Sequence, residues 1–388
     1  MKRFFVLPTA VAVFGLAAVV VAPATAAAPA EVQAIGTGPT TEQVSAFVTP
    51  DLLWVATKTS ERLGIELSPV QRALIDVIDP HDYQCTPTEM TTWVQSQLHG
   101  WTVEDQLFLY GATLQNLAGY ASMVVSPDTA PSYGPHGEFT KPITKTFGRL
   151  RAFWDIKSDD IHLLPMHGSI MTDRSALYTT FRTIFGRDET TSSRFADTYS
   201  NWAKGLIARL GDAPLLTLNA FAFSGVGDSN PGLAALPDAI VMGDGIQQAF
   251  TALGLGDVSP QSVLAHEFGH HIQYEDGLFS SPLTGAEASR RTELMADAFA
   301  AYFLAHARGA ALQWHRVQTF VRVFHSIGDC GFTDPGHHGT PDQRTRSAVW
   351  AYGLVITAPN RGHIMPSRTF AALFDAVLPV LVAPDAVH

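Results

Sequence analysis

Cysteine is almost absent from this chain, which has only Cys85 and Cys330 among its 388 residues. Two isolated cysteines lack the clustering of a zinc site built from cysteine thiolates, so such a site is excluded. An even number of cysteines in an exported protein permits one disulfide bond, and the alternative is two free thiols. The sequence leaves both states open.

The chain also lacks blocks of like charge, internal repeats and any strong basic character. Lys and Arg total 25 against 36 Asp and Glu, which gives a formal net charge of -11 at pH 7. Nucleic acids and anionic membrane surfaces attract basic patches, so this balance argues against both as partners. No segment after the N-terminal region is long and apolar enough to span a bilayer, and we expect no stable membrane insertion of the processed protein.

The N-terminus has the pattern of a secretory signal peptide. Lys2 and Arg3 precede an apolar stretch over residues 4–22, and small residues continue to residue 28. A short positive region, an apolar core and a small-residue exit are the features of a cleaved signal. The alternative, an uncleaved membrane anchor, fits the small-residue exit less well. We therefore predict a signal peptide over residues 1–28 and a secreted or cell-envelope location.

The rest of the chain predicts an α+β fold. Residues 29–145 have mostly helical apolar spacing, and we expect an accessory region or an inhibitory pro-segment there. Short strands are expected where β-branched and aromatic residues lie between turn residues, at 161–171, 215–223 and 239–242. Helices are expected at 52–63, 69–78, 104–124, 176–185 and 193–210, and they dominate from residue 259. A small mixed sheet followed by a mostly helical half would then form one domain of residues 146–388.

Residues 263–271 contain the pattern HExxH. His266 and His270 are four residues apart, so a helix places both on one face, where they can bind one metal ion. Glu267 then lies beside the open side of that ion, where it can hold a water molecule and take its proton. The alternative is a solvated helix with incidental histidines.

Turn residues mark the ends of this expected helix. Ser259 can cap its start, Pro260 suits the first helical position, and Gly277 can end it. Gly269 lies in the middle, where glycine costs about 1 kcal/mol relative to alanine. We expect a close approach by another element to compensate for that cost.

A second helix, expected over residues 284–308 and closed by Gly309, offers a third ligand. Glu293 and Asp297 are four residues apart on one face, among apolar neighbours. Carboxylates on an apolar face need partners, because an unpaired buried charge is costly. We assign Glu293 as the third metal ligand and Asp297 as the acceptor that fixes the ring of a ligand histidine. The alternative is a pair of surface acids balanced by nearby arginines.

The segment after this helix predicts a loop that enters a third helix. Thr340, followed by proline and then Gln343, has the pattern of a capping box. The loop just before it holds His338, which we predict to donate a hydrogen bond to the negative charge that develops on a substrate carbonyl. His337, Arg344 and Tyr352 are alternatives for this role. We expect His162, His167 and His271 to have structural roles.

These motifs together resemble the bacterial neutral zinc metallopeptidase family, which is similar to the gluzincins. The resemblance covers about residues 235–354 and rests on His266-Glu267-Phe268-Gly269-His270-His271-Ile272-Gln273, Glu293-Leu294-Met295-Ala296-Asp297, His338-Gly339-Thr340, Arg344, Trp350 and Tyr352-Gly353. It implies a zincin-like fold in which two histidines and a glutamate bind Zn²⁺. It also implies a peptide or protein substrate.

The expected activity is therefore hydrolysis of a peptide bond by an exported zinc enzyme, with Glu267 as general base. The strand at 239–242 precedes the HExxH helix, and as an edge strand it can pair with an extended substrate. One alternative uses Asp342 instead of Glu293 as the third ligand. Another is an exported binding protein without catalytic activity, in which the metal is structural.

Overall fold

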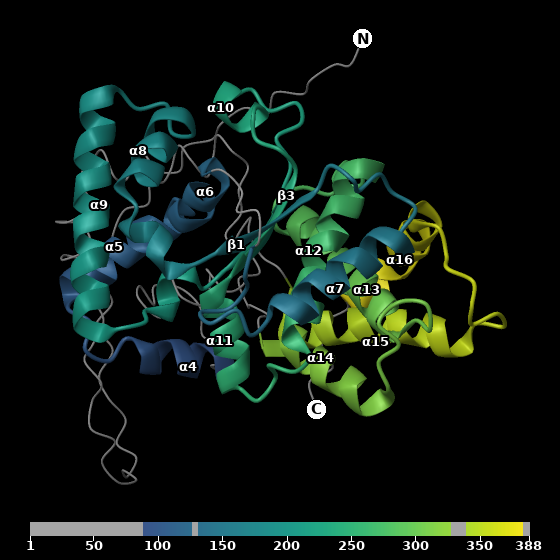
Figure 1. The fold of residues 1–388 in the computed structure, drawn as a ribbon. Coiled ribbons are helices and arrows are strands. Elements are labelled where there is room, and N and C mark those ends of the chain that lie inside the picture. Colours follow the sequence, from purple (N-terminus) through teal and green to yellow (C-terminus); the bar gives the residue numbers. More distant parts are fainter. Residues whose placement is uncertain (1–87, 126–130, 327–338, 383–388) are drawn as a thin grey trace, which may run out of the picture. The chain divides into compact units, whose positions relative to one another are not determined.

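The computed structural model describes residues 88–125, 131–326 and 339–382, which all fall in one compact unit (Figure 1). The expected signal peptide, the expected helices at 52–63 and 69–78, both cysteines and His338 lie outside the described residues.

The described part is an α+β fold with a small mixed sheet of three strands. β1 (His162–Met166) pairs in parallel with β3 (Ala239–Gly243), and β2 (Ala220–Phe223) pairs with the other edge of β3 in antiparallel orientation. All five residues of β3 are buried, as expected for an apolar central strand. Our expectation of an edge strand at 239–242 is therefore wrong, because β3 has a partner on each side. The edge strand near the HExxH helix is β2.

Helices pack against both faces of this sheet. α6 (Leu117–Val124) contacts β1 and β3, whereas α12 (Ser259–Asp276) contacts β2 and β3, and Figure 1 shows these two helices on opposite faces. The single helix expected at 104–124 is divided into α5 (Val103–Leu114) and α6. The division occurs at Asn116, which has a left-handed backbone conformation that ends one helix and redirects the next.

The regions before and after residue 145 share one core. α5 contacts α9 (Glu189–Leu210), and α6 contacts α8 (Arg174–Thr183). The expected boundary at residue 145 falls inside α7 (Thr140–Phe153), which packs against α12. The shorter elements are α4 (Glu89–Gln97), η1 (Gly168–Thr172), η2 (Pro214–Thr217), α10 (Pro231–Ala234) and α11 (Asp244–Ala252).

α13 (Ala286–Ala305) is the centre of the C-terminal half. Its residues are buried from Ser289 to Leu304, because α12, α14 (Trp314–Ser326), α15 (Pro341–Thr357) and α16 (Ser367–Leu381) all contact it. Its carboxylates are therefore held inside the protein and need partners there. Within the described ranges, no helix has both the length and the apolar character needed to cross a membrane.

Candidate metal centre

The HExxH motif lies on α12, whose two ends differ in how well the sequence predicted them. Gly277 ends the helix in a left-handed conformation, and its N–H donates to the carbonyls of Gln273 and Tyr274, as expected. At the other end, Val258 is the capping residue and Ser259 is the first helical residue, so the expected Ser259 cap is wrong. The Ser259 hydroxyl is buried and has no hydrogen-bond partner among the described residues.

Gly269 lies at a close approach of α12 to α13. A Cβ atom at this position would lie 3.0 Å from the Cα and 3.1 Å from the carbonyl oxygen of Ala296. These distances are shorter than ordinary van der Waals contacts, so only glycine fits without displacing α13. The close approach expected from the sequence is confirmed. It lies between the same two helices that carry the histidines of the motif and Glu293.

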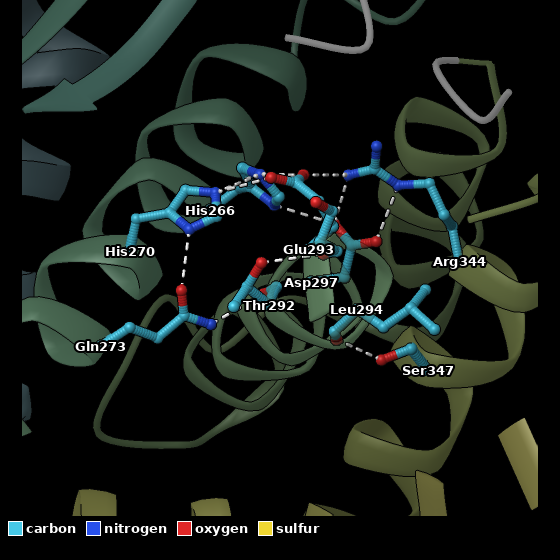
Figure 2. A network of polar contacts seen from close by, with 10 residues as sticks. His266, His270, Gln273, Thr292, Glu293, Leu294, Asp297, Arg344 and Ser347 are labelled. Atoms are coloured by element: carbon cyan, nitrogen blue, oxygen red, sulfur yellow. Dashed lines mark hydrogen bonds and ion pairs between the residues drawn. The ribbon is translucent and has the colours of Figure 1, made fainter. Parts of the chain in front are cut away.

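Three side chains of α12 and α13 converge on one point (Figure 2). The Nε2 atoms of His266 and His270 are 3.2 Å apart, and each lies 3.3 Å from a carboxylate oxygen of Glu293. A tetrahedral zinc ion bound about 2.0–2.1 Å from its nitrogen ligands separates them by about 3.3 Å. The donor atoms therefore already have the spacing of a tetrahedral zinc site, and the three residues can hold a metal ion.

The hydrogen bonds around this cluster fix which imidazole nitrogens carry a proton. His266 Nδ1 lies 2.8 Å from Asp297 Oδ1, and His270 Nδ1 lies 2.9 Å from Gln273 Oε1. The Gln273 amide cannot be reversed, because its Nε2 donates to the carbonyl of Thr292 at 2.7 Å. Each Nδ1 is therefore a donor, and each Nε2 can present a lone pair to the cluster. Nitrogen lone pairs and carboxylate oxygens that face one another need a positive charge between them, which a metal ion or a proton can supply.

Arg344 of α15 anchors the Asp297 carboxylate. Its Nε donates to Oδ2 at 2.8 Å and its Nη2 to Oδ1 at 2.7 Å, and both side chains are fully buried. The guanidinium also lies 3.9 Å from Glu293. Because it is enclosed and bound to Asp297, Arg344 is placed to position the cluster rather than to contact a substrate. With Glu267 included, three carboxylates and one guanidinium leave two negative charges, which match one divalent cation.

Both imidazoles have raised pKa values in the metal-free protein. Burial alone would lower the pKa of His266, but its hydrogen bonds to Asp297 and Glu293 outweigh burial and raise it to about 10. Burial would also lower the pKa of His270, but the Glu293 carboxylate outweighs burial and raises that pKa above its usual value. Protons therefore compete with a metal ion for the two Nε2 atoms.

Glu267 lies next to this cluster and against β2. Burial raises the pKa of its carboxyl group, and the two histidines and a backbone hydrogen bond from Ala222 partly oppose that rise. A carboxylate whose pKa is raised toward neutral is a better proton acceptor than an exposed one. The contact with Ala222 also places the edge strand beside the group that would handle the proton.

The structure separates the other candidate residues from the cluster. His271 is buried, with Nε2 2.9 Å from the carbonyl oxygen of Ala239, so it joins α12 to the sheet. His167 pairs with Asp244 at 2.8 Å. Asp342 is exposed in the first turn of α15, and the cluster found among the described residues contains Glu293 instead. The expected capping box of Thr340 and Gln343 is confirmed at the start of α15.

The sequence predicted no role for Gln273. It offered Arg344 only as one of several possible hydrogen-bond donors to the substrate carbonyl. A signal for Gln273 exists, because it lies three residues after His270 on the same helix face. Arg344 gives no such signal, since it is 47 residues from Asp297 in the chain.

No protein-family model, curated protein or solved structure matches this chain. The fold and the cluster therefore define it as an α+β protein with a buried His-His-Glu group that can hold a metal ion. Its function must be inferred from the geometry of that group.

Proposed function

We propose that this protein is a zinc-dependent peptidase of the gluzincin type, related to the bacterial neutral zinc metallopeptidases that its motifs resemble. One observation carries the proposal. The Nε2 atoms of His266 and His270 and the carboxylate of Glu293 have the separations of a tetrahedral zinc site, and Glu267 lies beside them.

The donor set fits zinc and leaves room for catalysis. Two imidazoles and one carboxylate are three ligands, and a catalytic zinc site keeps its fourth position open. When bound, zinc supplies a Lewis acid that polarises a carbonyl group and makes a water molecule easier to deprotonate. Asp297 and Gln273 hold the two imidazoles in the tautomer that a metal ion requires.

Glu267 is the proposed general base. It accepts the proton of the attacking water and afterwards delivers it to the nitrogen of the departing amine, so that no proton is lost overall. Burial keeps its pKa above the usual value, which favours both steps near neutral pH. His338 remains the proposed hydrogen-bond donor to the oxygen of the attacked carbonyl.

An extended peptide would pair with β2. β3 occupies one edge of β2, and the other edge has no strand partner among the described strands. An exposed strand edge binds an extended chain through main-chain hydrogen bonds. Because Ala222 of β2 contacts Glu267, a peptide paired there would pass beside the proposed base. We also propose that residues 1–28 direct the protein to the cell envelope or the exterior.

The test combines metal content with peptidase activity. We expect the purified protein to bind one zinc ion and to hydrolyse casein, and a chelator to stop the hydrolysis. Glu267→Gln should retain zinc and lose roughly 10²–10⁴-fold in activity, the usual contribution of a general base. Glu293→Ala should lose zinc, whereas Asp342→Ala should behave as wild type.

Two outcomes would contradict this proposal. Hydrolysis that persists in Glu267→Gln would reject the mechanism. A protein that binds zinc firmly but cleaves no peptide would instead be a binding protein with a structural metal.

A further inference from the structure

Two exposed aromatic residues lie next to the metal cluster. Tyr274 is one turn beyond His270 on α12, and Phe279 follows the end of that helix. Their rings are in contact, with centroids 4.7 Å apart, and 38% of Tyr274 and 42% of Phe279 are exposed. We call this pair the aromatic wall. Among the side chains that the structure describes, no other aromatic residue is exposed.

The wall touches the most accessible part of the cluster. The Phe279 ring is nearly parallel to the His270 ring, at an interplanar angle of 19° and a centroid distance of 6.5 Å. The side chain of His270 is 13% exposed, more than those of His266 and Glu293. The exposed Phe279 ring therefore lies beside the most accessible ligand side chain of the cluster.

The wall also lies close to the end of β2. Tyr274 packs against the ring of His271, with centroids 5.7 Å apart. His271 Nε2 lies 2.9 Å from the carbonyl oxygen of Ala239, which pairs with Phe223 at the end of β2. Ala222, the residue before Phe223, contacts the proposed base. β2 therefore has the proposed base at its middle and the wall near its end.

Adjacent aromatic rings at a surface are informative, because a soluble protein gains by burying them. Rings beside a site with only a few polar groups are typical of a surface that receives an apolar part of a ligand. We propose that the aromatic wall binds a large apolar side chain next to the scissile bond, so that the enzyme prefers peptides with an aromatic or large aliphatic residue there. This inference rests on the proposed peptidase function.

The expected preference is moderate, since the wall covers a bound side chain from one side only. Enclosed apolar pockets discriminate by roughly 10–200-fold for a methylene group, and for an open wall with a large side chain we expect about tenfold in kcat/KM. The discrimination should depend on the Phe279 ring.

The experiment maps every cleavage site in denatured casein by mass spectrometry, and then measures kcat/KM for two peptides. The peptides are identical except that one has phenylalanine and the other serine at the preferred position. Wild type is compared with Phe279→Ala, with Phe279→Tyr, which keeps a ring, and with Leu373→Ala. Leu373 lies on α16 and is as exposed as Phe279, at 42%, so it is a matched surface control.

The inference predicts that large apolar residues are enriched beside the cleavage sites of wild type, Phe279→Tyr and Leu373→Ala. Phe279→Ala should retain zinc and should lose about tenfold more activity on the phenylalanine peptide than on the serine peptide.

Hydrolysis by wild type without enrichment, or an equal loss on both peptides in Phe279→Ala, would overturn the inference and leave the peptidase function intact. Absence of hydrolysis by wild type would reject the proposed function and this inference together.

Discussion

Replacing Arg344 by methionine should destabilise the protein strongly. The change removes the guanidinium that donates two hydrogen bonds to Asp297, at 2.7 and 2.8 Å, while keeping an unbranched apolar stem. Both residues are fully buried, so the Asp297 carboxylate loses its main partner where water cannot replace it. Removing one member of a buried ion pair costs about 3–5 kcal/mol, and we expect a loss of that size in the free energy of unfolding.

Urea unfolding with excess chelator measures this loss without a contribution from bound metal. With a slope of about 3 kcal/mol per M, the midpoint should fall by about 1–2 M urea. Arg344→Lys should have an intermediate effect, because lysine keeps the charge but not the planar fork of donors. The double variant Asp297→Asn with Arg344→Met should lose less than the sum of the two single changes, since the charged partners of the Asp297–Arg344 pair are then removed together.

Arg174 and Asp197 provide a matched control. They also form a guanidinium–carboxylate pair with two hydrogen bonds, but both side chains are about half exposed. Arg174→Met should therefore cost much less than Arg344→Met, because solvent screens an exposed pair. If Arg344→Met costs no more than Arg174→Met, the reasoning about the buried pair is refuted.

Three further measurements test the cluster and the helix contact. Gln273→Ala should raise the zinc dissociation constant about 10–100-fold in a chelator competition, because the His270 ring loses its acceptor; unchanged affinity would contradict that role. Zinc binding at pH 8 should release about one proton from His266, whose pKa near 10 keeps it protonated in the metal-free protein. Calorimetry in two buffers of different ionisation enthalpy measures this release, and its absence would exclude the raised pKa. Gly269→Ala should cost about 1–3 kcal/mol in urea unfolding, because the new Cβ meets α13. Gly205→Ala in α9, where nothing lies within 4 Å of the added Cβ, should instead stabilise by about 0.5–1 kcal/mol.

The features that the sequence predicted well depend on short stretches of chain. Gly277 ends α12, and the capping box of Thr340 and Gln343 starts α15, because both signals act within a few residues. The spacing of His266 and His270 is also a local signal, because the two residues are one helical turn apart. The pairing of α12 with Glu293 needed one further argument, that carboxylates on an apolar helix face must find partners.

The features that the sequence missed depend on distant partners. β3 is a short apolar run, and its place between two other strands follows from pairing with residues 162–166 and 220–223, which lie far away in the chain. The ring contact between Phe279 and His270 likewise requires the turn after α12. Ser259 has a capping residue's identity, but Val258 occupies the cap.

The contact between Gly269 and Ala296 has a consequence for the choice of ion. It leaves no room for a side chain between α12 and α13 at this point, and the donor atoms of His266, His270 and Glu293 on the same two helices lie within 4.8 Å of one another. Calcium takes six to eight oxygen ligands at about 2.3–2.6 Å and would require a wider and more oxygen-rich site. The missing side chain at residue 269 therefore favours a small ion with nitrogen ligands over calcium at the candidate site.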